Sequence, residues 1–125
     1  IRYIQESLFH FPFYSFKEIN LKPISIRETV EVLNKTKCML DVNPPYQVSL
    51  STRAYEAIAS RRKYITTNKH IMDYEFYDPN NILIIDIDNP VIPKKFIQTP
   101  FNSVSEEVLY KYSVAGLVDD LFNDV

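Results

Sequence analysis

Residues 47–68 read QVSLSTRAYEAIASRRKYITTN, and this stretch decides the fold. It begins with a polar loop, continues with helical spacing of apolar residues at 52–60, and ends in a short run at 63–67 that is typical of a buried strand. Arg53 and Glu56 are three residues apart, so they share one face of the expected helix. In open α/β sheets, anionic ligands bind where a polar loop leads from a strand into a helix N-terminus. The stretch therefore predicts an anion-binding edge.

The residues before this stretch predict a helix and a strand. Ser25 and Glu28 form the capping box S-x-x-E, in which each residue can satisfy a backbone N–H of the first turn. Apolar residues then recur at helical spacing, and the helix is expected to end near residues 35–37, where lysines suit the helix dipole. Residues 38–42 (CMLDV) follow as a short buried strand, which a Pro-Pro pair stops.

The residues after the stretch complete an alternating pattern. The run ILIIDI at 82–87 is typical of a parallel strand covered on both faces. A short helix is expected at 93–97, and a helical tail begins at a second capping box, Ser103 and Glu106, and restarts at Ser113. The order of elements predicts an α/β fold, namely a Rossmann-like three-layer α/β/α domain with a short, mostly parallel sheet of four or five strands.

Length, charge and cysteine content exclude several classes of protein. The chain has 125 residues, and we expect residues 1–125 to form a single domain. Its net charge of −2 gives no global field that favours nucleic acid or an anionic membrane. The one cysteine, Cys38, excludes an internal disulfide and a cysteine zinc cluster, and it fits a reducing cytoplasm. No apolar run approaches the roughly 18 residues of a membrane span.

Glycine and aromatic residues are unevenly used. The only glycine is Gly116, so the chain has no Gly-rich phosphate loop, and a phosphate must be bound by side chains and a helix N-terminus. Residues 8–16 are rich in Phe and Tyr and are either an edge element or a surface that contacts another domain. His10 within them is expected to be a packing or surface residue. Asp86 and Asp88 are expected to form a turn at a strand end, because no third metal ligand is close in sequence.

The expected ligand edge carries a set of residues that can bind a nucleotide. Arg53 can bind a phosphate through its two-pronged guanidinium group, with the Ser51 and Thr52 hydroxyls and the helix N-terminus beside it. Glu56 can accept two hydrogen bonds from the cis-diol of a ribose. The neighbouring loops supply Asn43, Gln47 and Asn68. On spacing alone, the favoured interpretation of Arg53 and Glu56 is a surface ion pair worth about 0.2–0.5 kcal/mol.

Several segments resemble a known family. Residues 56–67, EAIASRRKYITT, are similar to the segment E-A-(small or apolar)-A-x-G-x-P-(apolar)-I-x-(T or S) in the donor-binding domains of GT-B glycosyltransferases. The segments KTKCMLDVN, Q-x-S-L-S-T-R-x-Y-E-A, K-Y-I-T-T-N and D-Y-E-F-Y-D-P-N-N-I-L-I-I-D resemble bacterial proteins of lipopolysaccharide and capsular polysaccharide biosynthesis. The resemblance covers about residues 25–122.

The resemblance implies a nucleotide-diphosphate sugar as donor, with Glu56 on the ribose and Arg53 near the diphosphate. It implies no bound metal and no cofactor, and it leaves the catalytic residues unassigned. Three positions depart from the family pattern: Val48 stands where many GT-B enzymes have an acid, Arg61 replaces a glycine and Lys63 replaces a proline. The glycan or lipid-linked acceptor would bind a separate N-terminal domain. The fragment alone is therefore expected to be inactive.

These expectations combine into a cytoplasmic, C-terminal donor-binding domain of a glycosyltransferase that builds bacterial surface polysaccharide. Peripheral association of the full protein with the inner face of the membrane is left open. The alternative is a non-catalytic α/β binding or interaction module, a degenerate transferase domain in a polysaccharide assembly complex, which the departures at Val48 and Arg61 favour. A third possibility is a nucleotide sensor of receiver or flavodoxin shape, in which Asp41 would be the phosphoacceptor by position.

Overall fold

A three-stranded parallel sheet organises the part of the chain that the computed structural model describes, residues 22–123. Its strands are β1 (Cys38–Asp41), β2 (Lys63–Thr66) and β3 (Ile82–Ile84), in the spatial order β1–β2–β3. The predicted α/β class and parallel pairing are confirmed, with three strands in the described residues where four or five were expected. The aromatic segment 8–16 and His10 lie outside the described residues. The described residues divide into two units, 22–30 and 31–123, and the sheet belongs to the second.

The helices follow most of the predicted boundaries. They are α2 (Ile26–Lys35), α3 (Thr52–Ala59), the 3₁₀ helix η2 (Lys69–Asp73), α4 (Lys94–Gln98), α5 (Glu106–Lys111) and α6 (Val114–Asn123). At the start of α2, the Ser25 backbone N–H donates to a Glu28 carboxylate oxygen at 2.9 Å, and the Glu28 N–H donates to the Ser25 hydroxyl at 3.3 Å. These reciprocal bonds confirm the first capping box. The Ser113 carbonyl and hydroxyl both accept from the first turn of α6, which confirms the restart.

Two predicted boundaries are wrong. Ser105, and not Ser103, caps α5, because the Ser105 hydroxyl accepts from the Val108 N–H at 3.3 Å. This choice places two glutamates in the first turn, where the helix dipole favours negative charge. The strand at 82–87 ends at Ile84, although the Ile85 N–H still donates to the Thr66 carbonyl at 2.9 Å. Beyond it, the Asp88 N–H donates to the Asp86 carboxylate at 2.8 Å, which makes the expected strand-end turn.

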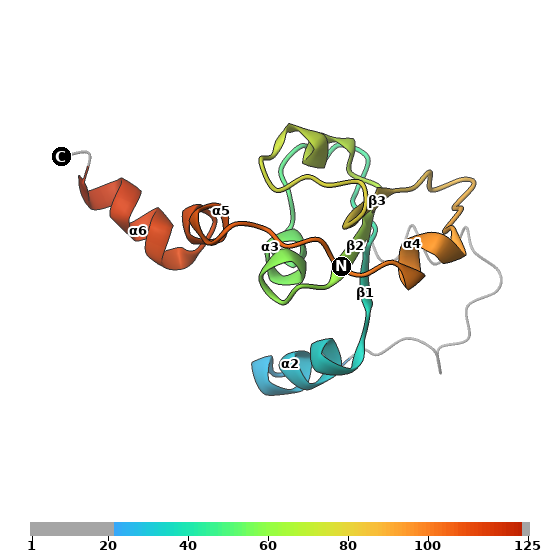
Figure 1. The fold of residues 1–125 in the computed structure, drawn as a ribbon, viewed down its shortest axis with the longest axis horizontal. Coiled ribbons are helices and arrows are strands. Elements are labelled where there is room, and N and C mark those ends of the chain that lie inside the picture. The colour runs from blue at the N-terminus through green and yellow to red at the C-terminus, as the bar shows by residue number, and fades with distance from the viewer. Residues whose placement is uncertain (1–21, 124–125) are drawn as a thin grey trace. The chain divides into compact units, whose positions relative to one another are not determined.

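The side chains of the sheet alternate between two apolar clusters. On one face, Tyr64, Ile82 and Met39 pack with three residues of α3: Ala54, Ala57 and Ile58. On the other face, Ile65 and Ile85 pack with Phe96 of α4. Figure 1 shows α3 and α4 on opposite sides of the strands. Every residue of β2 is buried, as expected for the middle strand of a sheet covered on both faces.

Lys63 is a buried cation at the start of β2. Its Nζ donates to the Asn80 carbonyl at 2.6 Å and to the Thr99 hydroxyl at 2.7 Å, and it lies 4.6 Å from the centre of the Phe96 ring. Burial lowers the pKa of Lys63. The ammonium group therefore serves to attach the segments around Asn80 and Thr99 to the sheet, because each partner replaces water that burial removed.

A second set of bonds holds the segment after α4. Asn81 is fully buried; its side-chain amide donates to the Asn102 carbonyl at 2.9 Å, and its side-chain oxygen accepts from the Asn102 N–H at 2.8 Å. The Asn102 side chain in turn donates to Asp78 at 2.8 Å. Asn81 thus pairs with the backbone of Asn102 as a neighbouring strand would, and it directs the chain toward α5 along the sheet.

The C-terminus of α3 forms a Schellman motif around an arginine. The Arg62 N–H donates to the Ala57 carbonyl at 2.8 Å and the Arg61 N–H donates to the Ile58 carbonyl at 3.1 Å. The motif requires a left-handed residue, and Arg61 adopts it with φ 55°. A side chain in this conformation costs about 1 kcal/mol relative to glycine. The position where the family pattern has glycine is therefore one whose backbone conformation favours glycine.

We expect Arg61→Gly to raise the free energy of unfolding by about 0.5–1 kcal/mol, because it relieves the left-handed strain. Urea unfolding monitored by circular dichroism measures the change. Arg61→Ala is the matched control: it also removes the exposed pair with Glu106 at 3.9 Å but keeps a Cβ in the left-handed conformation. A gain in Arg61→Ala equal to that in Arg61→Gly would contradict the strain account.

Candidate functional site

The carboxyl ends of β1 and β2 bring three of the predicted site residues together. Asn43 and Ser51 lie at the two ends of the loop that joins β1 to α3, and Asn68 follows β2. Parallel strands present their carboxyl ends at one edge of the sheet, which is where open α/β sheets bind ligands. We call this region, residues 41–53 with 66–68, the strand-end edge.

A carboxylate anchors the centre of the strand-end edge. Asp41, the last residue of β1, accepts hydrogen bonds at Oδ2 from the Ser51 hydroxyl and from the Tyr64 hydroxyl, the latter at 2.6 Å. Ser51 is the N-cap residue of α3, and its side chain makes no capping bond because its hydroxyl donates to Asp41 instead. The Asp41 carboxylate therefore attaches the start of α3 to the sheet, and the backbone N–H groups of the first turn keep no side-chain acceptor from Ser51.

Asn43 and Asn68 hold the loops that border the edge. The Asn43 side-chain oxygen accepts from the Thr66 hydroxyl at 2.9 Å, and the Asn43 N–H donates to the Thr67 hydroxyl at 2.9 Å. Asn68 is buried, and its amide donates to the Ser49 carbonyl at 3.1 Å while its oxygen accepts from the His70 N–H at 3.0 Å. Both amides thus shape the edge by binding backbone and side-chain groups of the protein.

The other predicted residues lie on the loop and on the exposed side of α3. Gln47 donates from Nε2 to the Ser49 carbonyl at 3.1 Å, within its own loop. Thr52, Arg53 and Glu56 are exposed on α3. In the described residues no ion pair joins Arg53 to Glu56, so the structure does not use them as the surface pair that spacing alone allowed. Their roles in binding a nucleotide stay predictions.

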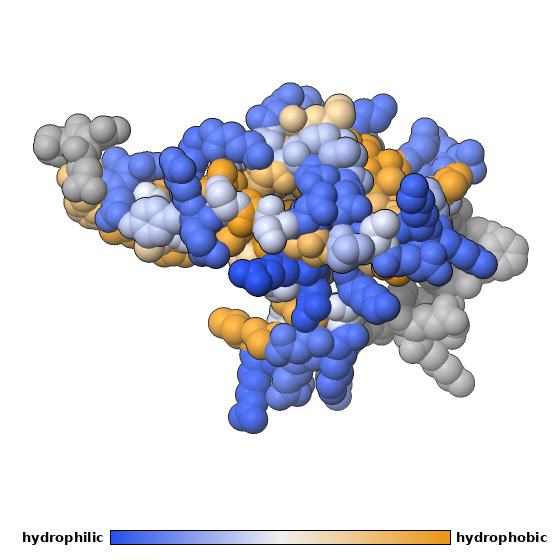
Figure 2. Space-filling model, in the orientation of Figure 1, coloured by the Kyte–Doolittle hydropathy of each residue, from blue (hydrophilic) through white to orange (hydrophobic). Residues whose placement is uncertain are grey.

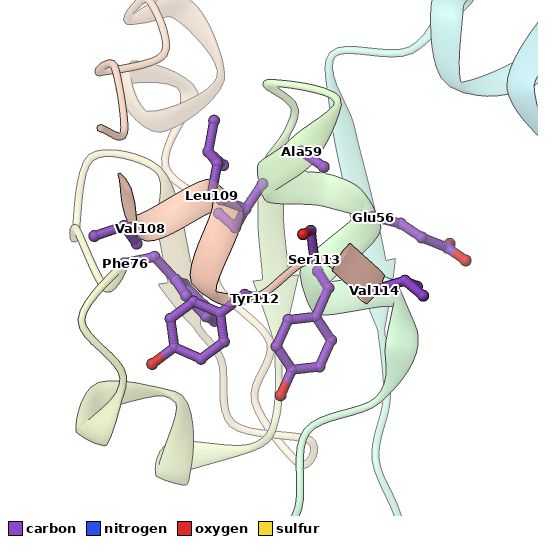
Figure 3. A pocket seen from close by; sticks show the side chains of 10 residues that line it. Glu56, Ala59, Phe76, Val108, Leu109, Tyr112, Ser113 and Val114 are labelled. Carbon is purple, nitrogen blue, oxygen red and sulfur yellow. The ribbon is translucent and has the colours of Figure 1, made fainter. Parts of the chain in front are cut away.

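An apolar cavity of about 250 Å³ lies beside α3. Its lining comes from α3, α5, the start of α6 and the loop before β3, and comprises Tyr55, Glu56, Ile58, Ala59, Phe76, Val108, Leu109, Tyr112, Ser113 and Val114. The rings of Phe76 and Tyr112 meet edge to face with centroids 5.0 Å apart. Figure 3 shows the Glu56 carboxylate pointing away from these rings. The cavity can therefore take an apolar group but offers it no charge.

Two tyrosines beside these sites have unusually high pKa values. Burial, with the Asp41 hydrogen bond adding to it, raises the pKa of Tyr64 to about 12. Burial, together with the neighbouring Tyr74, raises the pKa of Tyr55 to about 12 as well. Both hydroxyls are protonated at neutral pH, so Tyr64 acts as a hydrogen-bond donor to Asp41.

The described residues contain no cluster of three or more histidine, cysteine, aspartate or glutamate side chains that could hold a metal ion. Asp86 and Asp88 form a turn, as described above. Between residues 22 and 123, no helix combines the length and apolar character needed to cross a membrane.

Sequence reasoning missed the bonds between Asp41, Ser51 and Tyr64. It considered Asp41 only as a phosphoacceptor, whereas Oδ2 of this carboxylate already accepts from two hydroxyls. The strand register is the signal that would have placed the two side chains together. It pairs Met39 with Tyr64, and Asp41 lies two residues further along β1 on the same face. It also missed the cavity, whose lining combines segments up to 59 residues apart, Tyr55 to Val114.

We expect Tyr64→Phe to lower the free energy of unfolding at pH 7 by about 1–2 kcal/mol, because Asp41 loses a donor that burial makes hard to replace. The raised pKa means that the folded state holds the Tyr64 proton more tightly than the unfolded chain, whose tyrosines titrate near pH ~10. This contribution is complete below that pH and is lost as pH rises toward about 12. Urea unfolding between pH 9 and pH 11 should show a shallower loss of stability in Tyr64→Phe than in the wild type.

The matched control is Tyr77→Phe, since the described residues give the Tyr77 hydroxyl no hydrogen-bond partner. It should leave both the stability at pH 7 and its alkaline slope nearly unchanged. Equal effects of the two substitutions would mean that the bond to Asp41 contributes nothing specific.

Comparison with known proteins identifies no relative of this chain. The chain matches no protein-family model, no curated protein and no solved structure. The features that bear on function are therefore the strand-end edge, the start of α3 and the exposed side chains beside it.

Proposed function

We propose that the chain is the nucleotide-sugar-binding domain of a glycosyltransferase, with the donor at the strand-end edge. The observation that carries the proposal is the β1–α3–β2 unit: a parallel strand pair whose connecting helix begins at that edge, with Arg53 exposed in its first turn. This arrangement supports the binding of a diphosphate, because first-turn N–H groups and a guanidinium group both attract anions.

The Asp41 carboxylate limits where a diphosphate can bind. Asp41 donates nothing and its negative charge repels phosphate, although two hydroxyls partly neutralise its field. The diphosphate would therefore lie on the Arg53 and Thr52 side of the helix start. Ser51 contributes by holding the helix in place, since its hydroxyl proton is already donated to Asp41.

The remaining exposed groups can bind the ribose and the base of the nucleotide. Glu56 is one turn further along α3 and exposed, and no ion pair joins its carboxylate to another described residue. It can therefore accept from the ribose hydroxyls. The loop at residues 43–50 borders the same edge and would contact the base. Asn43, Gln47 and Asn68 support this loop by the hydrogen bonds described above.

The resemblance to GT-B glycosyltransferases also implies what the rest of the protein would do. The sheet with α3 and α4 on opposite faces is compatible with a Rossmann-like three-layer domain, the C-terminal half of a GT-B enzyme of bacterial lipopolysaccharide or capsular polysaccharide biosynthesis. The acceptor, a glycan or a lipid-linked saccharide, would bind a separate N-terminal domain, and the reaction would take place on the cytoplasmic side of the membrane.

A specific observation favours a second candidate, a non-catalytic interaction module. The polar side chains of the strand-end edge are largely engaged with one another, while the cavity beside α3 is apolar and open to a partner group. A degenerate transferase domain would keep the fold in this way and lose the ligand. Nucleotide binding separates the two candidates.

We expect UDP or GDP, or a sugar derivative of one of them, to bind the wild-type protein in isothermal titration calorimetry. Arg53→Ala should weaken that binding at least tenfold, because a charged hydrogen bond contributes about 1.5–3 kcal/mol. Glu56→Ala should weaken it less, because it loses only the ribose contacts.

Arg61→Ala is the matched control, an exposed arginine at the opposite end of the same helix, and it should bind the nucleotide as the wild type does. No binding of any nucleotide would leave the interaction module as the better account. Binding that Arg53→Ala and Arg61→Ala weaken equally would point to nonspecific charge attraction and would exclude this site.

A further inference from the structure

The outer side of α6 is an exposed apolar stripe. It consists of Val114, Leu117, Val118, Leu121 and Phe122, with Val114 80% and Phe122 74% exposed. At about 100° per residue these five positions fall on one side of the helix. Figure 2 shows hydrophobic side chains along α6, at the left of the view, with hydrophilic ones beside them.

The single glycine of the chain fixes the direction in which this stripe faces. Gly116 is buried on the opposite side of α6, where a Cβ would collide with the Tyr110 carbonyl oxygen at the end of α5. The close approach requires glycine at this position. It packs the glycine side of α6 against α5 and leaves the apolar side largely exposed among the described residues.

The stripe is continuous with the apolar cavity. Val114 belongs to both, since it begins the stripe and also lines the cavity with Tyr55, Leu109 and Tyr112. The combined surface therefore has a hollow at one end and a ridge about 15 Å long, given the ten residues of α6. A hollow that takes an anchor side chain, next to a long apolar strip, is the form of surface that binds an amphipathic helix.

Charge selects among possible occupants. Residues 106–123 contain four acids, Glu106, Glu107, Asp119 and Asp120, and one lysine, Lys111, so their net charge is 1 − 4 = −3. Asp119 and Asp120 flank the stripe on its two sides. Ion pairs with residues outside this segment leave the count unchanged, because Glu75 offsets Lys111 at 2.7 Å and Arg61 offsets Glu106 at 3.9 Å. Two copies of this surface would place like charges together, and an anionic membrane would be repelled.

We propose that the cavity and the α6 stripe together bind an amphipathic helix of a partner, with an apolar stripe flanked by lysine or arginine. The apolar residues of the partner helix would cover the α6 stripe, one of them entering the cavity beside Tyr55. Its basic residues would pair with Asp120 and with Asp119, whose carboxylate also accepts a hydrogen bond from the Tyr110 hydroxyl. This surface shares Glu56, which lines the cavity, with the proposed nucleotide site, and its other residues lie outside the strand-end edge.

Two synthetic helical peptides test the proposal. Both carry the same leucine stripe and one tryptophan, and they differ only in having lysine or glutamate as flanking residues. The chain itself has no tryptophan, so peptide fluorescence reports binding without background. The lysine peptide should bind at least tenfold more tightly than the glutamate peptide. Leu121→Asp should weaken the lysine peptide at least tenfold, and Asp120→Lys should reduce the preference for lysine.

Val91→Asp is the control, because Val91 is 62% exposed and lies outside this surface. It should bind the lysine peptide as the wild type does, and all variants should keep the wild-type circular dichroism spectrum. Equal binding of the two peptides, absence of binding, or an equal loss in Val91→Asp would overturn the proposal. So would dimers of the chain that Leu121→Asp disrupts, or binding to phosphatidylserine vesicles that it abolishes.

Discussion

The Asp41 carboxylate is the group on which the rest of the structure depends. It ends β1, it accepts the hydroxyl of Tyr64 from the middle strand, and it accepts the hydroxyl of Ser51 at the start of α3. One charge thus joins a strand, its neighbour and the helix that connects them. A partly buried carboxylate without these donors would destabilise the fold, so the three residues must be present together. Any ligand at the strand-end edge meets a helix start that is already fixed in position.

Side-chain attachments of this kind are necessary because the parallel strands are short. The strands have only three or four residues each, so backbone hydrogen bonds alone hold little of the sheet. The apolar clusters on the two faces, the Lys63 ammonium and the Asn81 amide supply the remaining attachments. The polar groups lie at opposite ends of the strands: Lys63 and Asn81 near the amino ends, Asp41 and Asn68 at the carboxyl ends. At the carboxyl ends, the loops are therefore held in place while side chains on α3 stay exposed, as a binding site requires.

Local patterns in the sequence were enough to predict most elements of this fold. The run ILIIDI predicts a strand covered on both faces, and Ser25 with Glu28 predicts the start of α2, because each depends on residues close in sequence. The start of α5 was wrongly predicted at Ser103, since SVSEE offers two serines and two glutamates, and the hydrogen bond to Val108 decides for Ser105. The bonds from Asp41 and the lining of the cavity were not predictable in this way. They join residues that only the register of the strands and the packing of α5 bring together.

The site is only partly determined by these constraints. Asn43, Ser51 and Asn68 come together as the order of elements predicts, whereas their side chains bind the protein itself. Arg53 and Thr52 remain available at the helix start. Different residues thus support the edge and remain exposed on it, because groups that hold a loop in place are seldom also free to bind a ligand. This separation divides the edge into a supporting part around Asp41 and an exposed part on α3.

The most direct test of this division is an NMR titration of the ¹⁵N-labelled protein with UDP and GDP. The account predicts that the largest shifts occur at the backbone amides of residues 51–56, with smaller shifts in the loop at 43–50. The amides of α5 and α6 should not change. Shifts confined to the cavity or to α6, or no shifts at millimolar nucleotide, would contradict the claim that the strand-end edge binds a nucleotide.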